Sequence, residues 1–154
     1  MPYIKDLASA IKDILDSIKS ILESATEEGE LLEGVKEVVR GDRVRPRPEP
    51  PTIWIFTDEA VAIHPPMSLA EKWSLPIVLS AVYKTDDPDT GYMEATSLAA
   101  KARSVILKDR TLGLRNFVQD VQSVRFDPSG PHFNEGQLYG AAATVNVIFT
   151  IFEK

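Results

Sequence analysis

The chain has 154 residues, of which 44% are hydrophobic and 26% are charged, with a formal net charge of −6. This composition predicts one domain, spanning residues 1–154, with its own hydrophobic core. The negative charge argues against a broad interface with nucleic acid, and the absence of cysteine excludes disulfides, thiolate metal ligands and a cysteine nucleophile. The charged N-terminal residues differ from a signal peptide, and no apolar run approaches the ~20 residues that cross a bilayer. We therefore expect a soluble intracellular product.

Residues 4–25 have the clearest periodicity in the chain. Apolar side chains recur three or four positions apart, which predicts an amphipathic helix of about six turns. The stripe is broad enough to pack on a sheet of the same subunit, and packing on a neighbouring subunit is the alternative. Its members are Ile4, Leu7, Ile11, Ile14, Ile18 and Ile21, with Ala8, Leu15 and Leu22 beside them.

The next region is rich in turn-forming residues and proline. Residues 26–34 are acidic with two glycines, which favours a turn, and residues 35–40 read as a short strand. Four of the six residues from 46 to 51 are proline, which forbids a helix and removes sheet donors. We expect a Pro/Arg-rich loop at 41–51 that is either mobile or held against a partner. Its arginines are candidate contacts for a protein or a phosphate group, with solvation as the alternative: Arg43, Arg45 and Arg47.

Runs of β-branched and aromatic residues predict strands in the rest of the chain. A loop at 65–74, which contains Trp73, and a Pro/Gly-rich loop at 127–136 separate some of them. Along the last strand, apolar side chains alternate with polar ones, so one face is expected to be buried. The expected strands are 52–57, 60–64, 75–84, 117–126 and 138–152.

A second helix is predicted at about residues 92–108, after a turn at 86–91, with Gly113 as its C-terminal stop. Carboxylates of the turn are expected to accept hydrogen bonds from free N–H groups at the helix start. Two helices are too few to alternate with the strands, so the predicted class is α+β: a mostly antiparallel sheet of about four to five strands with two helices packed on it. The buried side of the second helix should be Ala95, Ala99, Ala102, Val105 and Ile106, with Leu98 beside it.

Residues able to carry chemistry are scattered. His64 and His132, the two histidines, stand beside prolines without a second ligand at helical spacing. The aspartates at 86–89 lack the glycine and glutamate spacing of a calcium loop. Neither a Walker lysine nor a Gly-x-Ser-x-Gly element is present. We therefore predict no metal, no cofactor and no enzymatic activity.

The segment from Leu107 to Phe126, LKDRTLGLRNFVQDVQSVRF, resembles a stretch of tail-completion (tail-terminator) proteins of long-tailed bacterial and archaeal viruses. In that family a helix ends in a leucine, and a polar turn leads to Thr-Leu-Gly before the next strand. Leu107 and the triplet Thr111–Gly113 stand in those places, with Leu114 where a second glycine is common. The opening helix, the proline-introduced strand, the long strand at 75–84 and the closing strand follow the family's order.

This resemblance implies a structural role without an active site. Subunits of the family form a ring, expected to be a hexamer, on the last ring of the tail tube, where they stop tube growth and present a surface to the head. The implied partners are other copies of the chain, the tail tube protein and the head-completion or connector protein, at the tail–head junction of a virion made in the host cytoplasm. The alternatives are another neck, head-closure or baseplate component, and a cellular α+β ligand-binding domain or enzyme.

The closing strand carries apolar side chains on both faces near its end. An exposed edge of this kind promotes aggregation unless a neighbouring subunit covers it, and cover by the opening helix is the alternative. Neither a membrane nor a specific nucleic-acid sequence is an expected partner. The candidate interaction residues are Ile148 and Phe152 for the ring, with Trp73, Arg43, Arg45 and Arg47 as further candidates.

Overall fold

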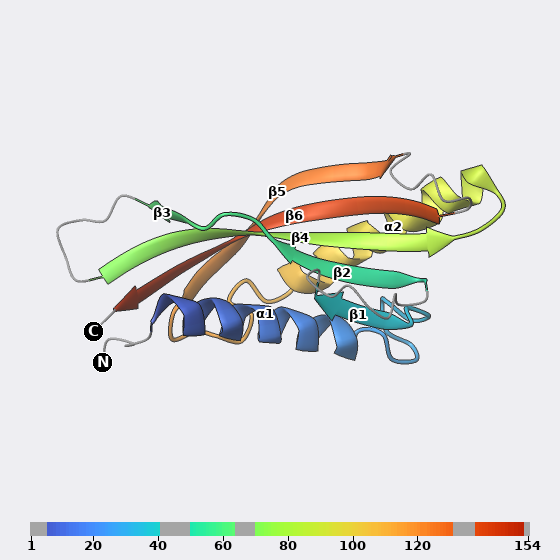
Figure 1. The fold of residues 1–154 in the computed structure, drawn as a ribbon. Coiled ribbons are helices and arrows are strands. Elements are labelled where there is room, and N and C mark those ends of the chain that lie inside the picture. The colour runs from blue at the N-terminus through green and yellow to red at the C-terminus, as the bar shows by residue number, and fades with distance from the viewer. Residues whose placement is uncertain (1–5, 41–49, 64–69, 131–137, 153–154) are drawn as a thin grey trace.

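The computed structural model describes residues 6–40, 50–63, 70–130 and 138–152, which form two helices and six strands (Figure 1). The predicted α+β class is confirmed, with six strands in place of four to five. In chain order the elements are α1 (Leu7–Ser24), β1 (Glu37–Arg40), β2 (Thr52–Thr57), β3 (Val61–Ile63), β4 (Ala70–Lys84), α2 (Pro88–Leu107), β5 (Val118–Gly130) and β6 (Leu138–Phe152).

All six strands belong to one sheet, in the order β1-β2-β4-β6-β5, and β3 also pairs with β4. Within the described ranges, β1 and β2 are parallel and every other pair is antiparallel. β4 and β6 pair along their whole length, from Ala70 opposite Phe152 to Lys84 opposite Leu138. This central pair runs the length of the molecule and supports the other elements (Figure 1).

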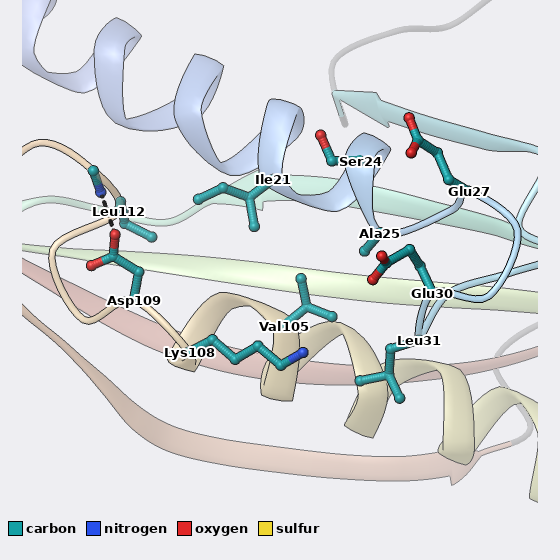
Figure 2. A pocket seen from close by; sticks show the side chains of 11 residues that line it. Ile21, Ser24, Ala25, Glu27, Glu30, Leu31, Val105, Lys108, Asp109 and Leu112 are labelled. Atoms are coloured by element: carbon teal, nitrogen blue, oxygen red, sulfur yellow. Dashed lines mark hydrogen bonds between the residues drawn. The ribbon is translucent and has the colours of Figure 1, made fainter.

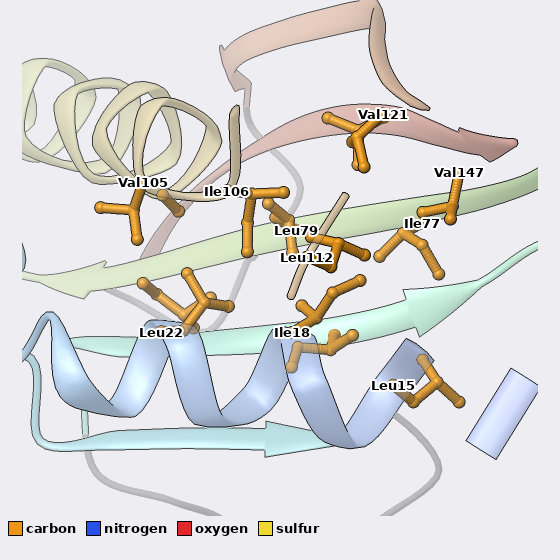
Figure 3. Packing of buried hydrophobic residues seen from close by; sticks show 14 of the residues in the cluster. Leu15, Ile18, Leu22, Ile77, Leu79, Val105, Ile106, Leu112, Val121 and Val147 are labelled. Atoms are coloured by element: carbon orange, nitrogen blue, oxygen red, sulfur yellow. The ribbon is translucent and has the colours of Figure 1, made fainter. Parts of the chain in front are cut away.

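The hydrophobic core lies on one face of the sheet, between the strands and both helices (Figure 3). Alternation along β6 turns Val145, Val147, Phe149 and Ile151 into this core, where each is 0% exposed. α2 meets the same face with small side chains, which let the helix lie close to the strands. Its buried residues are the five predicted ones, Ala95, Ala99, Ala102, Val105 and Ile106, together with Gly91 and Leu98.

α1 packs on the core of its own subunit, as the sequence favoured. It begins after Asp6, whose carboxylate accepts a hydrogen bond from the N–H of Ser9 at 2.7 Å. The predicted stripe is slightly displaced, because Ala8 is exposed and Ala10 is buried instead. Figure 3 shows side chains of α1 pointing toward α2 and the strands; the buried ones are Ala10, Ile14, Leu15, Ile18 and Leu22.

β4 begins at Ala70, so the predicted loop at 65–74 is wrong in its second half, and Trp73 lies in a strand. Trp73 is aligned with Phe149 of β6 on one side and Ala62 of β3 on the other. It is half-buried against the core. Both strand partners come from other parts of the chain, and their packing favours a strand where the local pattern did not.

Pro76 lies in the middle of β4 rather than at its start, a position where a proline normally removes a ladder hydrogen bond. Its carbonyl accepts a hydrogen bond from the N–H of Asp58 at 3.1 Å. In an antiparallel strand the N–H and C=O of one residue point to the same side, so the missing donor also faces this side. There β2 has ended at Thr57 and β3 has not yet begun at Val61. The gap between these strands accommodates the proline.

β5 continues to Gly130 through Pro128, so the loop predicted at 127–136 begins too early. Proline and glycine there suggested a turn. β5 is an edge strand, however, and an edge tolerates proline because one side of the strand needs no donor.

The start of α2 also differs from the prediction. The helix begins at Pro88, so Gly91 lies inside it rather than in the preceding turn. The carboxylate of Asp87 at the N-cap accepts a hydrogen bond from the hydroxyl of Thr90 and none from a backbone N–H, so the expected side-chain cap is wrong. The helix ends at Leu107, before the glycine predicted to stop it.

Candidate functional site

Ile148 and Phe152 lie on the sheet face opposite the core, where neither helix packs. Both side chains are half-buried. The expectation that they stand on an exposed edge is wrong, because β6 lies between β4 and β5. Cover by the opening helix is also wrong, because the buried side of α1 belongs to the core on the other face. The side chains of β6, and not its backbone, are therefore available for contact on this face.

The sheet register brings two further apolar side chains to the same face. Ser74 of β4 is aligned with Val61 of β3 on one side and with Ile148 of β6 on the other. Ile63 is two positions further along β3, and so points the same way. Val61 is 56% exposed and Ile63 is 36% exposed. Val61, Ile63, Ile148 and Phe152 are called the apolar strip below; β3 and the end of β6 lie at one end of the molecule (Figure 1).

Aromatic side chains of β2 occupy the same sheet face. The rings of Trp54 and Phe56 are stacked, with centroids 6.1 Å apart. Phe56 is 39% exposed and is aligned with Val78 of β4, which is aligned with Thr144 of β6. The face therefore carries exposed apolar area on both sides of the gap at Pro76.

The remaining candidate residues do not join the apolar strip. Trp73 lies on the core side of β4, and its Nε1 donates a hydrogen bond to the Glu71 carboxylate at 3.2 Å. Arg43, Arg45 and Arg47 lie outside the described residues.

The Thr-Leu-Gly turn, which carries the family resemblance, joins α2 to β5 and also holds α1. The Asp109 carboxylate accepts hydrogen bonds from the Thr111 N–H at 2.9 Å, the Thr111 hydroxyl at 2.7 Å and the Gly113 N–H at 3.0 Å. Leu112 and Gly113 have φ values of 56° and 71°, and the Leu112 side chain is buried in the core. The Ser17 hydroxyl of α1 donates to the Leu112 carbonyl at 2.6 Å. These contacts give the turn a structural role.

The turn and the start of β5 contain charged groups whose pKa values are shifted by their hydrogen bonds. Hydrogen bonds from Thr111, and a weaker one from Gly113, hold the pKa of the Asp109 carboxyl below its ordinary value of 3.8. Arg110 donates to Asp120 of β5 at 2.8 Å, which lowers the pKa of that carboxyl and raises the pKa of the guanidinium. The Arg110–Asp120 pair joins the turn to the start of β5.

A groove of about 440 Å³ lies between the C-terminal ends of α1 and α2 (Figure 2). Its apolar lining includes Ala25, Val105 and Leu112, which are buried, and Leu31, which is 40% exposed. Charged side chains surround this lining. In Figure 2 the end toward the 26–34 turn carries the acidic residues Glu27 and Glu30, and the other end carries Asp109. Lys108 also lines the groove. Below, we call it the acidic groove.

Groups suited to metal chemistry are not brought together in the part of the chain that the structure describes. No cluster of three or more histidine, aspartate or glutamate side chains able to hold a metal ion is found there. His64 and His132 lie outside the described residues. Neither α1 nor α2 is long and apolar enough to cross a membrane.

Sequence reasoning did not single out Val61, Ile63 or the acidic groove. The alternation of apolar residues at 61 and 63 was visible, but their alignment with Ile148 depends on the register of β4 between them. The groove forms because the ends of two helices far apart in the chain lie close together, and no local sequence pattern predicts that contact.

No protein-family model matches the chain, and no curated protein matches it in sequence.

Proposed function

We propose that this protein is a structural subunit that associates with copies of itself into a ring, and that the ring caps a viral tail tube as a tail terminator. One observation carries the self-association: the apolar strip lies on a sheet face that neither helix covers. Apolar surface of this kind on a folded domain marks an interaction site. A closed ring needs two different patches on each subunit, and the strip supplies one of them.

The more specific role as a tail terminator rests on the resemblance at residues 107–126 and on the order of the elements. The Asp109 hydrogen bonds give the Thr-Leu-Gly turn a physical reason to recur, because they hold Leu112 and Gly113 in left-handed conformations. A subunit of this role contributes surfaces rather than catalytic groups. The ring end that faces the tube must match the tube's growing surface. The other end must lack such a surface, so that no further tube subunits can add.

The self-association is tested by measuring the mass of the purified protein with native mass spectrometry over a range of concentrations. Val61→Asp places a charge in the strip, and Val124→Asp is the matched control, because these valines are 56% and 55% exposed and Val124 lies on β5 outside the strip. We expect a ring for the wild-type protein and for Val124→Asp, and smaller species for Val61→Asp. Circular dichroism should show that all three proteins are folded.

The role on the tail is tested by adding the ring to isolated tail tubes with free ends. A terminator is expected to bind one end of each tube and to stop further addition of tube protein. Binding to the head connector without binding to tubes would favour a head-closure component instead. A wild-type chain that stays monomeric at high concentration and on tail tubes would refute the proposal.

A further inference from the structure

The acidic groove has an apolar lining and a negative rim. Glu27 and Glu30 are both exposed, and within the described residues neither carboxylate has a hydrogen-bond or ion-pair partner. The segment from Glu23 to Gly34 contains five glutamates and no lysine or arginine. Asp109 also lines the groove, but its carboxylate is occupied by the turn that follows. Among the residues that the structure describes, Glu27 and Glu30 thus leave negative charge that a ligand can neutralise.

The two helices add to this negative charge. α1 and α2 both end at the groove, and the C-terminus of a helix carries a partial negative charge. Neither helix has a basic residue in its last turn to offset that charge. Lys108, which follows α2, is the one cation among the lining residues. The groove therefore suits a ligand that places an apolar side chain on the lining and positive charges at the rim.

The chain itself contains a segment of that chemistry. Residues 43–47 have the sequence Arg-Val-Arg-Pro-Arg, with three positive charges and no negative one. In an extended segment alternate residues point to opposite sides, so Val44 and Pro46 share one side and the arginines share the other. Long arginine side chains can lie along apolar surface while their guanidinium groups reach nearby carboxylates.

We propose that the acidic groove of one subunit binds the 43–47 segment of a neighbouring copy of this chain. Val44 and Pro46 contact the apolar lining, and the arginines pair with Glu27 and Glu30. This inference rests on the proposed self-association, and the groove and the segment form a subunit contact separate from the apolar strip. The groove and the segment are different surfaces, so the contact runs head to tail and is compatible with ring closure.

A charge exchange between two variants tests this contact. The groove variant is Glu27→Lys/Glu30→Lys, and the segment variant is Arg43→Glu/Arg45→Glu. Each variant alone presents like charges at every subunit contact, so we expect each to lose the ring in native mass spectrometry. In an equal mixture, each groove can receive a segment of opposite charge from the other variant, so alternating rings are expected to return. The matched control is Glu23→Lys/Glu28→Lys, which makes the same change in charge outside the groove lining and should keep the ring.

Return of the ring in the mixture supports the proposal, because a contact between the segment and the groove of its own chain cannot be repaired by mixing. Loss of the ring in each variant without return in the mixture would overturn it. Intact rings in both single variants would overturn it as well.

A second measurement separates this inference from the proposed function. A fluorescent peptide of residues 41–51 is titrated with the full chain, and its anisotropy is followed. We expect binding to the wild-type chain and to the control, and binding at least tenfold weaker to the groove variant. Equal binding to all three would refute the groove contact, even if rings form. A wild-type chain without rings that still binds the peptide would refute the ring and keep the groove contact.

Discussion

The two faces of the sheet differ in what covers them, although the same strands form both. On the helix-covered face, residues of β6 such as Val147 and Phe149 are 0% exposed. On the other face, their neighbours Ile148 and Thr150 are half-buried, and neither helix lies over them. One strand thus contributes alternately to a closed core and to a surface open to a partner. The covered face determines whether the subunit folds, and we expect the open face to determine whether it assembles.

The largest expected difference between the two faces comes from truncating two adjacent residues of β6, one on each face. Phe149→Ala removes a fully buried aromatic side chain that packs edge to face on Phe117, with ring centroids 6.3 Å apart. This change should lower the free energy of unfolding by about 3–5 kcal/mol. Ile148→Ala removes a half-buried side chain from the open face and should cost about 1 kcal/mol. Urea unfolding followed by circular dichroism measures both values. Similar losses would show that something covers both faces equally.

A smaller effect is expected where α2 approaches the covered face. A Cβ at Gly91 would overlap the ring of Tyr139 on β6, so Gly91→Ala should cost about 1–3 kcal/mol. Tyr139→Ala removes the obstacle but also loses packing. The double variant should therefore be less destabilised than the sum of the two single variants. Additive losses, measured by the same unfolding experiment, would mean that the ring moves aside freely.

Gly113 provides a contrast in which packing plays no part. A Cβ there would meet nothing within 4 Å, but the residue has a φ of 71°. Gly113→Ala should therefore cost about 1–2 kcal/mol through backbone conformation alone. A Tyr139→Ala change should leave this loss unaltered, unlike the loss at Gly91. Coupling between Gly113 and Tyr139 in a double-variant cycle would contradict the view that the loss at Gly113 comes from backbone conformation alone.

The smallest effect concerns acid stability of the turn that holds Leu112 in the covered face. Because the pKa of Asp109 is lowered in the folded chain, its contribution is present at neutral pH and is lost as the pH falls below about 3.8 toward the folded pKa. Asp109→Asn should reduce stability at pH 7 and weaken the dependence of stability on pH between 5 and about 3. Unfolding free energies across that range test it. An unchanged slope would mean that other carboxyls, such as Asp120 beside Arg110, account for the dependence.

The sequence by itself determined the elements whose signal is local. The periodicity of α1, the β-branched run of β2, the alternation of β6 and the small buried side of α2 were all predicted, and the structure confirms them. In each case the spacing of apolar residues predicts which side chains are buried, whichever element packs against them.

Only the tertiary structure decided the features that depend on pairing between distant segments. β4 begins at Ala70 because β3 and β6 lie beside it, and β5 runs through Pro128 because it is an edge. The strand register aligns Val61 with Ile148, and the fold joins the ends of α1 and α2 in one groove. Strand pairing and helix packing take their free energy from residues far apart in the chain, so the short-range pattern that fixes an element cannot fix its neighbours.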